Sequence, residues 1–262
     1  MHSEEIRNRL KRGQAVIGTW LQLPSPDSAE IIGQAGYAWA AADMEHGAIT
    51  RADLPGIFRA LELGGTAPFA RLLCADRERI KEALDSGARG LIFPMIESRS
   101  QLDDAIVHAL YPGEHGPVSG RRGVGFARAN AYGRNLAEHL APENGLGRNI
   151  VLVAQIEHIK ALDELEAIFS HPRLDAYMVG PYDLSASFGR PGDFNHPEYQ
   201  AVLKRLTETA KACGLPRGIH QVEPEPFALK ARIDEGYSFL AYGIDTLFLS
   251  RGAVNPFPKN QT

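Results

Sequence analysis

The sequence is poor in cysteine and has no long apolar run. Its two cysteines, Cys74 and Cys213, stand apart without a CxxC pair or a Cys/His cluster, which disfavours structural zinc and suits a reducing cytosol. We expect both to be small core residues rather than reactive thiols. The opening MHSEEIRNRLKRG mixes charges and lacks the apolar centre of a signal peptide, and no stretch is long enough to span a membrane. The sequence therefore predicts a cytoplasmic protein with no membrane partner.

A surplus of basic residues is also missing. The chain has 28 Lys and Arg against 32 Asp and Glu, a net charge of -4. It therefore has no excess positive charge with which to neutralise a phosphate backbone. No nucleic-acid partner is expected, and small metabolites are the favoured ligands.

What the chain does have is a regular alternation of short apolar runs with capped amphipathic segments. The eight runs span residues 15–23, 37–46, 67–73, 90–96, 149–157, 174–180, 216–222 and 238–249. Such alternation predicts parallel strands covered by helices. Eight units in 262 residues, without a GxGxxG turn after the first strand, favour a closed barrel over an open doubly wound sheet. We predict an α/β protein with one domain, residues 1–262, folded as a single (β/α)8 TIM-type barrel.

Side chains that can accept hydrogen bonds mark several expected helix starts. They are Ser25, Thr50, Ser98 and Asn195. The longest irregular stretch covers residues 112–148, and we expect it to be functional because loops of that length are uncommon in a compact domain.

Polar residues gather where the predicted strands end, and in an α/β barrel these ends form the mouth that carries the chemistry. Glu157 closes the fifth run, and Asp183 follows the sixth. Two carboxylates on adjacent strands, without Cys or a His pair, form a hard oxygen site suited to Mg2+ or Mn2+. Each acid could instead cap the helix after it. Their occurrence on adjacent strands favours the metal site.

His46 and Arg71 are the candidates for proton transfer and for anion binding. His46 follows Asp43 by three residues at a strand end, where its ordinary pKa suits chemistry near neutral pH, although it could also be a rim histidine without a role. Arg71 is the polar residue in the apolar run APFARLL, where an unpaired guanidinium would be costly. It needs an anion, which could be a substrate carboxylate or an acid on a neighbouring strand.

These residues lie in motifs that resemble the HpcH/HpaI family of class II aldolases, and the similarity runs from about residue 18 to about residue 249. The matching motifs are DMEHG (43–47), FAR (69–71), PM (94–95), RRGVG (121–125), QIE (155–157) and GPYDLSASFG (180–189). The last two, in this order and separation, are specific. The resemblance implies a metal-dependent aldehyde-lyase that cleaves or forms 4-hydroxy-2-keto acids from pyruvate and an aldehyde.

The resemblance also implies which residues form the metal and keto-acid sites. Carried over position by position, it makes Glu157 and Asp183 the metal ligands, with Mg2+ or Mn2+ as the ion and Co2+ as a further candidate. It implies that Arg71 holds the keto acid and polarises its carbonyl group. The metal and this guanidinium would then stabilise the enolate oxygen of pyruvate.

Four further roles follow from the same resemblance. His46 would act as the acid/base through a water molecule and would be oriented by Asp85. Gln155, expected behind the metal ligands, and Ser185 are candidates for substrate binding.

The seven lysines all fall in predicted helices or in the tail, so an aldolase mechanism through a Schiff base is disfavoured.

Family members assemble as hexamers, built as trimers of dimers that exchange the C-terminal helix, so a homo-oligomer is expected. In this chain the tail SRGAVNPFPKNQT carries Pro256 and Pro258 and no helical periodicity. The barrel is therefore expected to be modified at a short or missing eighth helix, and the exchange stays open. The segment GIHQVEPEPF after the seventh run could reshape the pocket, so the family's acceptor specificity is not carried over.

Three other functions stay open at this point. The same metal enolate could serve to decarboxylate oxaloacetate or to condense it with another acceptor. A CoA-ester lyase of the citrate lyase β type would need an adenine or diphosphate site, for which the basic pair Arg121-Arg122 is the one hint. A non-catalytic barrel would be expected to have lost His46 or a metal acid, and all of these are present.

Overall fold

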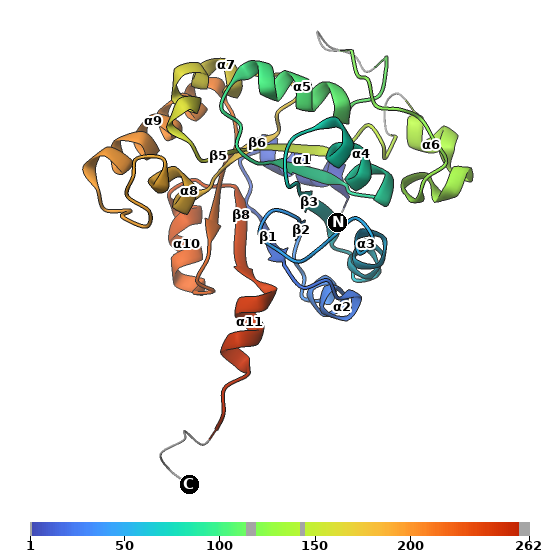
Figure 1. The fold of residues 1–262 in the computed structure, drawn as a ribbon, viewed down its shortest axis with the longest axis horizontal. Coiled ribbons are helices and arrows are strands. Elements are labelled where there is room, and N and C mark those ends of the chain that lie inside the picture. Colours follow the sequence, from blue (N-terminus) through green and yellow to red (C-terminus); the bar gives the residue numbers. More distant parts are fainter. Residues whose placement is uncertain (1, 114–118, 142–144, 257–262) are drawn as a thin grey trace.

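Eight parallel strands close into a barrel in the computed structural model, which describes residues 2–113, 119–141 and 145–256 (Figure 1). The strands pair in chain order, and β8 pairs with β1 to close the ring. They are β1 (Val16–Leu21), β2 (Trp39–Asp43), β3 (Ala67–Arg71), β4 (Gly90–Phe93), β5 (Val151–Ile156), β6 (Ala176–Val179), β7 (Arg217–Gln221) and β8 (Phe239–Ile244). The predicted α/β class and (β/α)8 barrel are confirmed, and each strand lies within one of the eight predicted runs.

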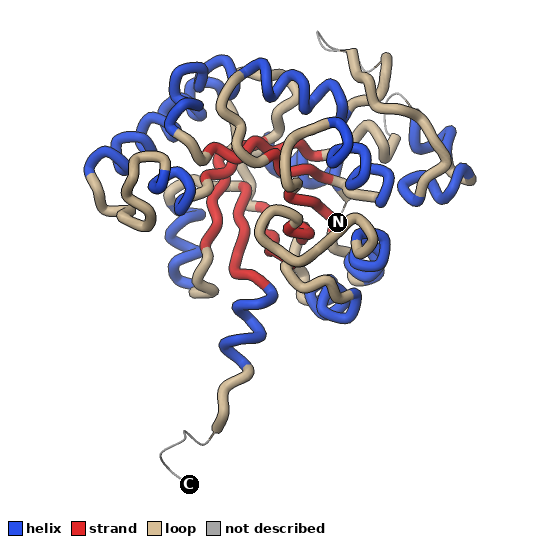
Figure 2. Tube along the Cα trace, viewed as in Figure 1, coloured by secondary structure: helices blue, strands red, loops and turns tan. Residues whose placement is uncertain are grey.

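Helices surround the strands (Figure 2), and α1 (Ser3–Lys11) precedes the barrel and contacts β1 and β5. The others are α2 (Pro26–Gln34), α3 (Leu54–Leu63), α4 (Arg77–Ser86), α5 (Arg99–Ala109), α6 (Leu136–Leu140), α7 (Leu165–Phe169), α8 (Pro181–Ala186), α9 (Pro197–Cys213), α10 (Pro226–Asp234) and α11 (Asp245–Gly252), with 3-10 turns η1 (Arg128–Gly133) and η2 (Ile159–Glu164). Segment 112–148 is thus partly helical. Within the described ranges, no helix has the length and apolar character needed to cross a bilayer.

Stacked aromatic rings fill the inside of the barrel. The ring of Trp39 is nearly parallel to that of Phe239, with centroids 4.6 Å apart, and stacks on Phe69 at 5.4 Å. Gly18 leaves room for this stack, because a Cβ at its position would lie 2.1 Å from an atom of the Trp39 ring. Burial of these large rings is strongly favourable, so the strands form a firm frame for the side chains at their ends.

Two of the four predicted helix starts are confirmed. The hydroxyl of Ser25 accepts the Ser28 amide of α2 at 3.2 Å, and that of Ser98 accepts the Gln101 amide of α5 at 3.2 Å. The other two are wrong. At Thr50 the bond runs the other way, because Asp53 accepts both the amide and the hydroxyl of Thr50, and α3 begins after Asp53. At α9 the capping side chain belongs to His196 rather than Asn195.

The last predicted strand is too long. It ends at Ile244, and the remaining residues of the run, 245–249, begin the helix α11. The reason is Asp245, whose buried carboxylate accepts the amides of Gln22 and Leu23 at the end of β1 and so ends the ladder there. The predicted short eighth helix is confirmed: α11 has eight residues and points away from the barrel (Figure 1). Pro258 lies outside the described residues.

The expectation that both cysteines are core residues is wrong. Cys74 is exposed in the loop after β3, and Cys213 is partly buried at the end of α9. The thiol of Cys74 donates to the carboxylate of Asp76 at 2.9 Å. Cys213 still packs against the hydrophobic core, so the expectation fails chiefly at Cys74.

A buried histidine on α6 makes the stability of the fold depend on pH. His139 is 2% exposed and its Nε2 lies 3.2 Å from the Tyr111 hydroxyl. Burial, with help from the positive charges of Arg122 and Arg89, lowers its pKa from 6.5 to about 4. The unfolded chain therefore takes up the proton first, so the stabilisation from neutral His139 is complete above pH 6.5 and is lost as the pH falls toward 4.

We expect His139→Gln to flatten the fall in melting temperature between pH 7 and pH 5 relative to the unsubstituted protein. Carboxyl groups whose pKa is raised in the folded protein add stability as the pH falls, which is the opposite effect. They are the same in both proteins, so their contribution cancels in the comparison. Calorimetric melting of both proteins at the two pH values measures the difference. Equal slopes would show that the imidazole does not titrate on unfolding as argued here.

Candidate active site at the carboxyl end of the barrel

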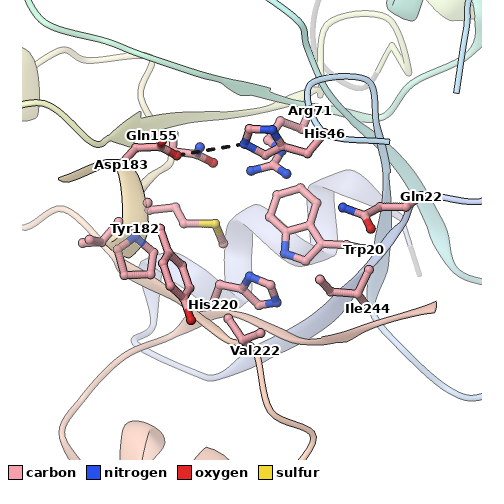
Figure 3. Close-up of a pocket in the computed structure, with 14 residues that line it drawn as sticks. Trp20, Gln22, His46, Arg71, Gln155, Tyr182, Asp183, His220, Val222 and Ile244 are labelled. Atoms are coloured by element: carbon pink, nitrogen blue, oxygen red, sulfur yellow. Dashed lines mark ion pairs between the residues drawn. The ribbon is translucent and has the colours of Figure 1, made fainter. Parts of the chain in front are cut away.

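A cavity of about 320 Å³ opens at the carboxyl ends of the strands (Figure 3). Four of the predicted site residues line it: His46, Arg71, Gln155 and Asp183. They come from segments far apart in the chain, at the ends of β2, β3, β5 and β6. The closed parallel barrel brings these ends to one mouth, as the sequence predicted.

Arg71 is held by an acid on the neighbouring strand. Asp43 and Arg71 are register partners on β2 and β3, and the guanidinium donates Nε to Oδ1 at 2.8 Å and Nη2 to Oδ2 at 2.6 Å. These bonds use two of the five guanidinium N-H groups. The strand-acid alternative is therefore confirmed, and Arg71 still borders the cavity, with its Cζ 4.5 Å from the centre of the Trp20 ring.

Asp43 also shapes the turn that carries the histidine. Its fully buried carboxylate accepts the backbone amides of Glu45 and His46, each at 3.2 Å, and the side-chain amide of Gln22 at 3.0 Å. Burial alone would raise the pKa of Asp43, but the hydrogen bonds and charge of Arg71 keep it below the usual value. Asp43 thus stays ionised and fixes both Arg71 and the turn at His46.

Glu157 is buried behind the cavity, next to the cavity-lining Gln155, and does not cap the next helix. Its Oε1 accepts the Met95 amide at 2.6 Å, and its Oε2 accepts the side-chain amide of Gln155 at 2.5 Å. Gly180, at the end of the adjacent strand, leaves the space, because a Cβ there would lie 2.3 Å from Oε2. The amide of Met95 is aimed by a left-handed backbone, φ 51°, which is uncommon for a residue with a side chain.

Asp183 lies in the first turn of α8, whose N-cap makes no side-chain bond. Its Oδ2 is 4.0 Å from His46 Nε2 (Figure 3, dashed line). The side chains of His46 and Asp183 are each about half exposed. Neither Asp183 nor Glu157 therefore forms the helix cap that was the structural alternative for these acids.

Glu45 is a site residue that sequence reasoning missed. Its side chain is 14% exposed, and its Oε2 is 3.4 Å from Arg71 Nε and 4.0 Å from His46 Nε2. Burial raises the pKa of Glu45 to about 7 against the charge of Arg71, and the charges of Asp43 and Asp183 add to the rise. Its place inside the DMEHG motif was the available signal, but the motif alone does not show which way the side chain points.

The carboxylates repel one another across the mouth. Burial, followed by the charge of Glu45, raises the pKa of Glu157 to about 7, and Asp183 contributes as well. One oxygen of Glu45 is buried without a hydrogen-bond partner in the described part of the chain. Such an excess of oxygen donors and negative charge fits a hard divalent cation.

The chain by itself does not offer a complete metal cage. Among residues 2–113, 119–141 and 145–256, no group of three or more His, Cys, Asp or Glu side chains is placed to hold a metal ion. Two carboxylates with the remaining positions filled by water or substrate oxygens match the usual habit of Mg2+. The residues present therefore fit a divalent cation that is bound by two carboxylates and takes its remaining ligands from the substrate and water.

Two predicted site residues lie elsewhere. Asp85 is on α4 at the outside of the barrel, where its carboxylate pairs with Lys81, so it does not orient His46 within the chain. Ser185 is buried in α8, donating to the Tyr182 carbonyl at 2.8 Å and accepting the Gly192 amide at 2.9 Å. Its hydroxyl is bonded within the protein and Ser185 is not among the residues that line the cavity, which corrects its assignment to substrate binding.

A closed parallel barrel with an arginine and carboxylates at the carboxyl ends of its strands has the arrangement of an α/β-barrel active site. The model of the HpcH/HpaI aldolase/citrate lyase family matches residues 16–251, and the chain belongs to this family. It is thus an enzyme of the lyase class that the family contains, and the resemblance inferred from the motifs is confirmed.

Named relatives resemble the chain over nearly its whole length. It is 34% identical to a hydroxypyruvate/pyruvate aldolase of Paraburkholderia phytofirmans, covering 94% of this chain and 93% of the relative. It is also 34% identical to a 2-keto-3-deoxy-L-rhamnonate aldolase of Klebsiella pneumoniae, covering 95% and 90%. A crystal structure of an HpcH/HpaI aldolase/citrate lyase family protein from Burkholderia cenocepacia superposes with a TM-score of 0.86 at 29% identity, covering 95% and 96%.

Proposed function

We propose that this enzyme is a divalent-metal-dependent aldolase that cleaves or forms 4-hydroxy-2-keto acids from pyruvate and an aldehyde. The observation that carries the proposal is the placement of Arg71, fixed by Asp43, in one cavity with Asp183 and beside Glu157. The names of the relatives, which are aldolases of pyruvate, hydroxypyruvate and a 2-keto acid, support it.

Glu157 and Asp183 would hold the cation, with Mg2+ or Mn2+ favoured and Co2+ a further candidate. Such a cation supplies Lewis-acid stabilisation of negative charge that grows on the keto oxygen. The N-H groups of Arg71 that Asp43 leaves free bind the keto acid and stabilise the same charge. Gln155, buried between Glu157 and the cavity, keeps Glu157 in place.

In cleavage the C3-C4 bond breaks, and its electron pair becomes the enolate of pyruvate while C4 becomes the aldehyde carbon. The C4 hydroxyl loses a proton, which His46 receives through a water molecule. The enolate then takes a proton at C3 to give pyruvate, and the condensation is the reverse. His46 suits this role because it is half-exposed at the mouth and its Nε2 lies 4.0 Å from a carboxylate oxygen of Glu45 and of Asp183.

Exchange of the C3 protons of pyruvate in D2O tests the proposal, because it reports enolate formation without any aldehyde. We expect NMR to show exchange that requires the enzyme and Mg2+ or Mn2+, together with pyruvate release from at least one 4-hydroxy-2-keto acid in a panel. Exchange no faster than in buffer, with metal present, would contradict the function proposed here.

Oxaloacetate separates this function from its nearest rival, decarboxylation or condensation of oxaloacetate. Faster pyruvate release from oxaloacetate than from every hydroxy-keto acid of the panel would favour that rival.

The CoA-ester alternative is weakened by Arg122, which is buried against the Tyr111 ring at 4.3 Å and donates to the Gly147 carbonyl. That the protein forms a homo-oligomer stays a prediction, and the family's hexamer is the arrangement to test. Its cytoplasmic location also stays a prediction.

A further inference from the structure

The turn that follows β4 has an unusual backbone. Met95 has a φ of 51°, in the left-handed region that residues other than glycine rarely adopt. Among the described residues other than glycine, positive φ occurs elsewhere only at Ala131 and Tyr132, in the 3-10 turn η1. Met95 belongs to the PM motif, residues 94–95, to which the proposed chemistry gives no role. A conformation that costs stability persists only where the surrounding structure enforces it.

Two links to β5 enforce this turn. Phe93, the last residue of β4, is the register partner of Ala154 on β5. The proline after it has no backbone N-H, so it cannot donate to the ladder. The amide of Ile96 then donates to the carbonyl of Gln155 at 3.2 Å, which returns the chain to β5. Met95 is held between these two links, and its own amide is turned from the ladder to a side chain.

That side chain is the buried carboxylate of Glu157. The amide of Met95 donates to Oε1 at 2.6 Å, while the side-chain amide of Gln155 donates to Oε2 at 2.5 Å. Glu157 is 1% exposed, so these protein donors, rather than bulk water, orient the carboxylate. A carboxylate has about four lone-pair sites. Two of them are used here, which leaves about one on each oxygen for a cation.

The contact does not depend on the chemistry of the methionine side chain. This side chain is 39% exposed, and Met95 is not among the residues that line the cavity. The donor to Glu157 belongs to the main chain, and its direction is set by the φ of residue 95. The requirement at this position is therefore a backbone conformation.

We propose that Met95 is a positioning residue, whose left-handed backbone aims an N-H group at Glu157 and so holds this carboxylate in the orientation that binds the divalent cation. The inference rests on the proposed function, because it concerns the cation site of that reaction. Met95 itself contacts neither the substrate nor the cation in this scheme. Hydrogen-bond partners behind a metal ligand orient it, and their loss costs about 10- to 100-fold in metal affinity.

Replacement of the Met95 amide by an ester tests the contact directly, because it removes one N-H group and keeps the side chain. We expect the Mn2+ dissociation constant, measured by titration calorimetry, to rise by about 10-fold or more. An ester at Ile96 is the matched control. It removes the neighbouring link to β5, whose acceptor is a backbone carbonyl, so it should lower the melting temperature without changing the Mn2+ affinity.

Met95→Asn and Met95→Val separate the backbone conformation from the side chain. Asparagine adopts positive φ more readily than most residues, whereas β-branched residues are strongly disfavoured there. We expect Met95→Asn to bind Mn2+ about as tightly as the unsubstituted enzyme, and Met95→Val to bind it about 10-fold more weakly or worse. A requirement for an apolar side chain predicts the reverse order, because valine is the closer match to methionine in polarity.

Leu73→Asn and Leu73→Val make comparable changes at a second exposed apolar residue. Leu73 lies in the loop after β3, has a negative φ and does not line the cavity. Both variants should bind Mn2+ as the unsubstituted enzyme does.

Mn2+ binding by the unsubstituted enzyme distinguishes failure of this inference from failure of the function on which it rests. If that enzyme binds no Mn2+, the proposed function and the role of Met95 are refuted together. If it binds Mn2+ and the ester at Met95 leaves the dissociation constant unchanged, only the role of Met95 is refuted. Equal affinities in Met95→Asn and Met95→Val, or an equal loss of affinity in the Ile96 ester, refute that role as well. If Met95→Val does not fold, the two esters and Met95→Asn still decide.

Discussion

Arg71→Ala is expected to lower kcat/KM for cleavage of a 4-hydroxy-2-keto acid by about 10²- to 10³-fold, because a preorganised donor to the developing enolate charge is lost. The same change leaves the buried Asp43 carboxylate without its bidentate partner. An uncompensated buried charge costs about 3 to 5 kcal/mol of stability, so the melting temperature of Arg71→Ala should fall as well. Steady-state kinetics and calorimetric melting measure the two effects.

Arg71→Lys separates the catalytic from the structural effect. Lysine keeps a positive charge for Asp43 but cannot bond to both carboxylate oxygens in the same plane while donating to the substrate. We expect most of the stability to return while kcat stays at least about 10²-fold low. A folded Arg71→Lys or Arg71→Ala enzyme with near-normal turnover would show that this guanidinium does not stabilise the reaction.

Removal of divalent metal is expected to abolish turnover, and Mg2+ or Mn2+ should restore it. Glu157→Gln is expected to weaken Mn2+ binding by more than about 10-fold, the scale on which metal sites respond even to loss of supporting groups. The reason is that the amide removes the charged oxygen while keeping the size of the side chain. Titration calorimetry with Mn2+ gives a readout that does not depend on activity.

Glu208→Gln is the matched control for that substitution. Glu208 is an exposed acid on α9, 3.8 Å from Lys204 and outside the cavity. The control makes the same change in charge, so its Mn2+ affinity should equal that of the unsubstituted enzyme. Turnover that survives exhaustive chelation, or full Mn2+ affinity in Glu157→Gln, would rule out the proposed metal site.

The barrel could be predicted because its signals are local. Each strand lies within a short apolar run of the sequence. Ser25 and Ser98 mark helix starts because each accepts a hydrogen bond from the backbone amide three residues later. The carboxyl ends of parallel strands must meet at one mouth. Placing Glu157 and Asp183 at the same mouth therefore required only the order of the elements.

The partners of the site residues could not be predicted in the same way. Asp43 and Arg71 are 28 residues apart in the chain, and their pairing follows from the register of β2 against β3. Asp85 was carried over from family spacing, but the spacing cannot show that α4 turns this side chain outward to Lys81. Ser185 is likewise buried, and its hydroxyl bonds to Tyr182 in its own helix and to Gly192 in the loop that follows.

By itself, then, the sequence determined the order of strands and helices, the closed barrel and the set of acids at its mouth, because apolar periodicity and capping act between near neighbours. The tertiary structure alone decided that Asp43 holds Arg71, that Glu45 joins the acidic cluster and that His220 faces the cavity. Those outcomes depend on register, helix rotation and burial, which arise only when distant segments pack together.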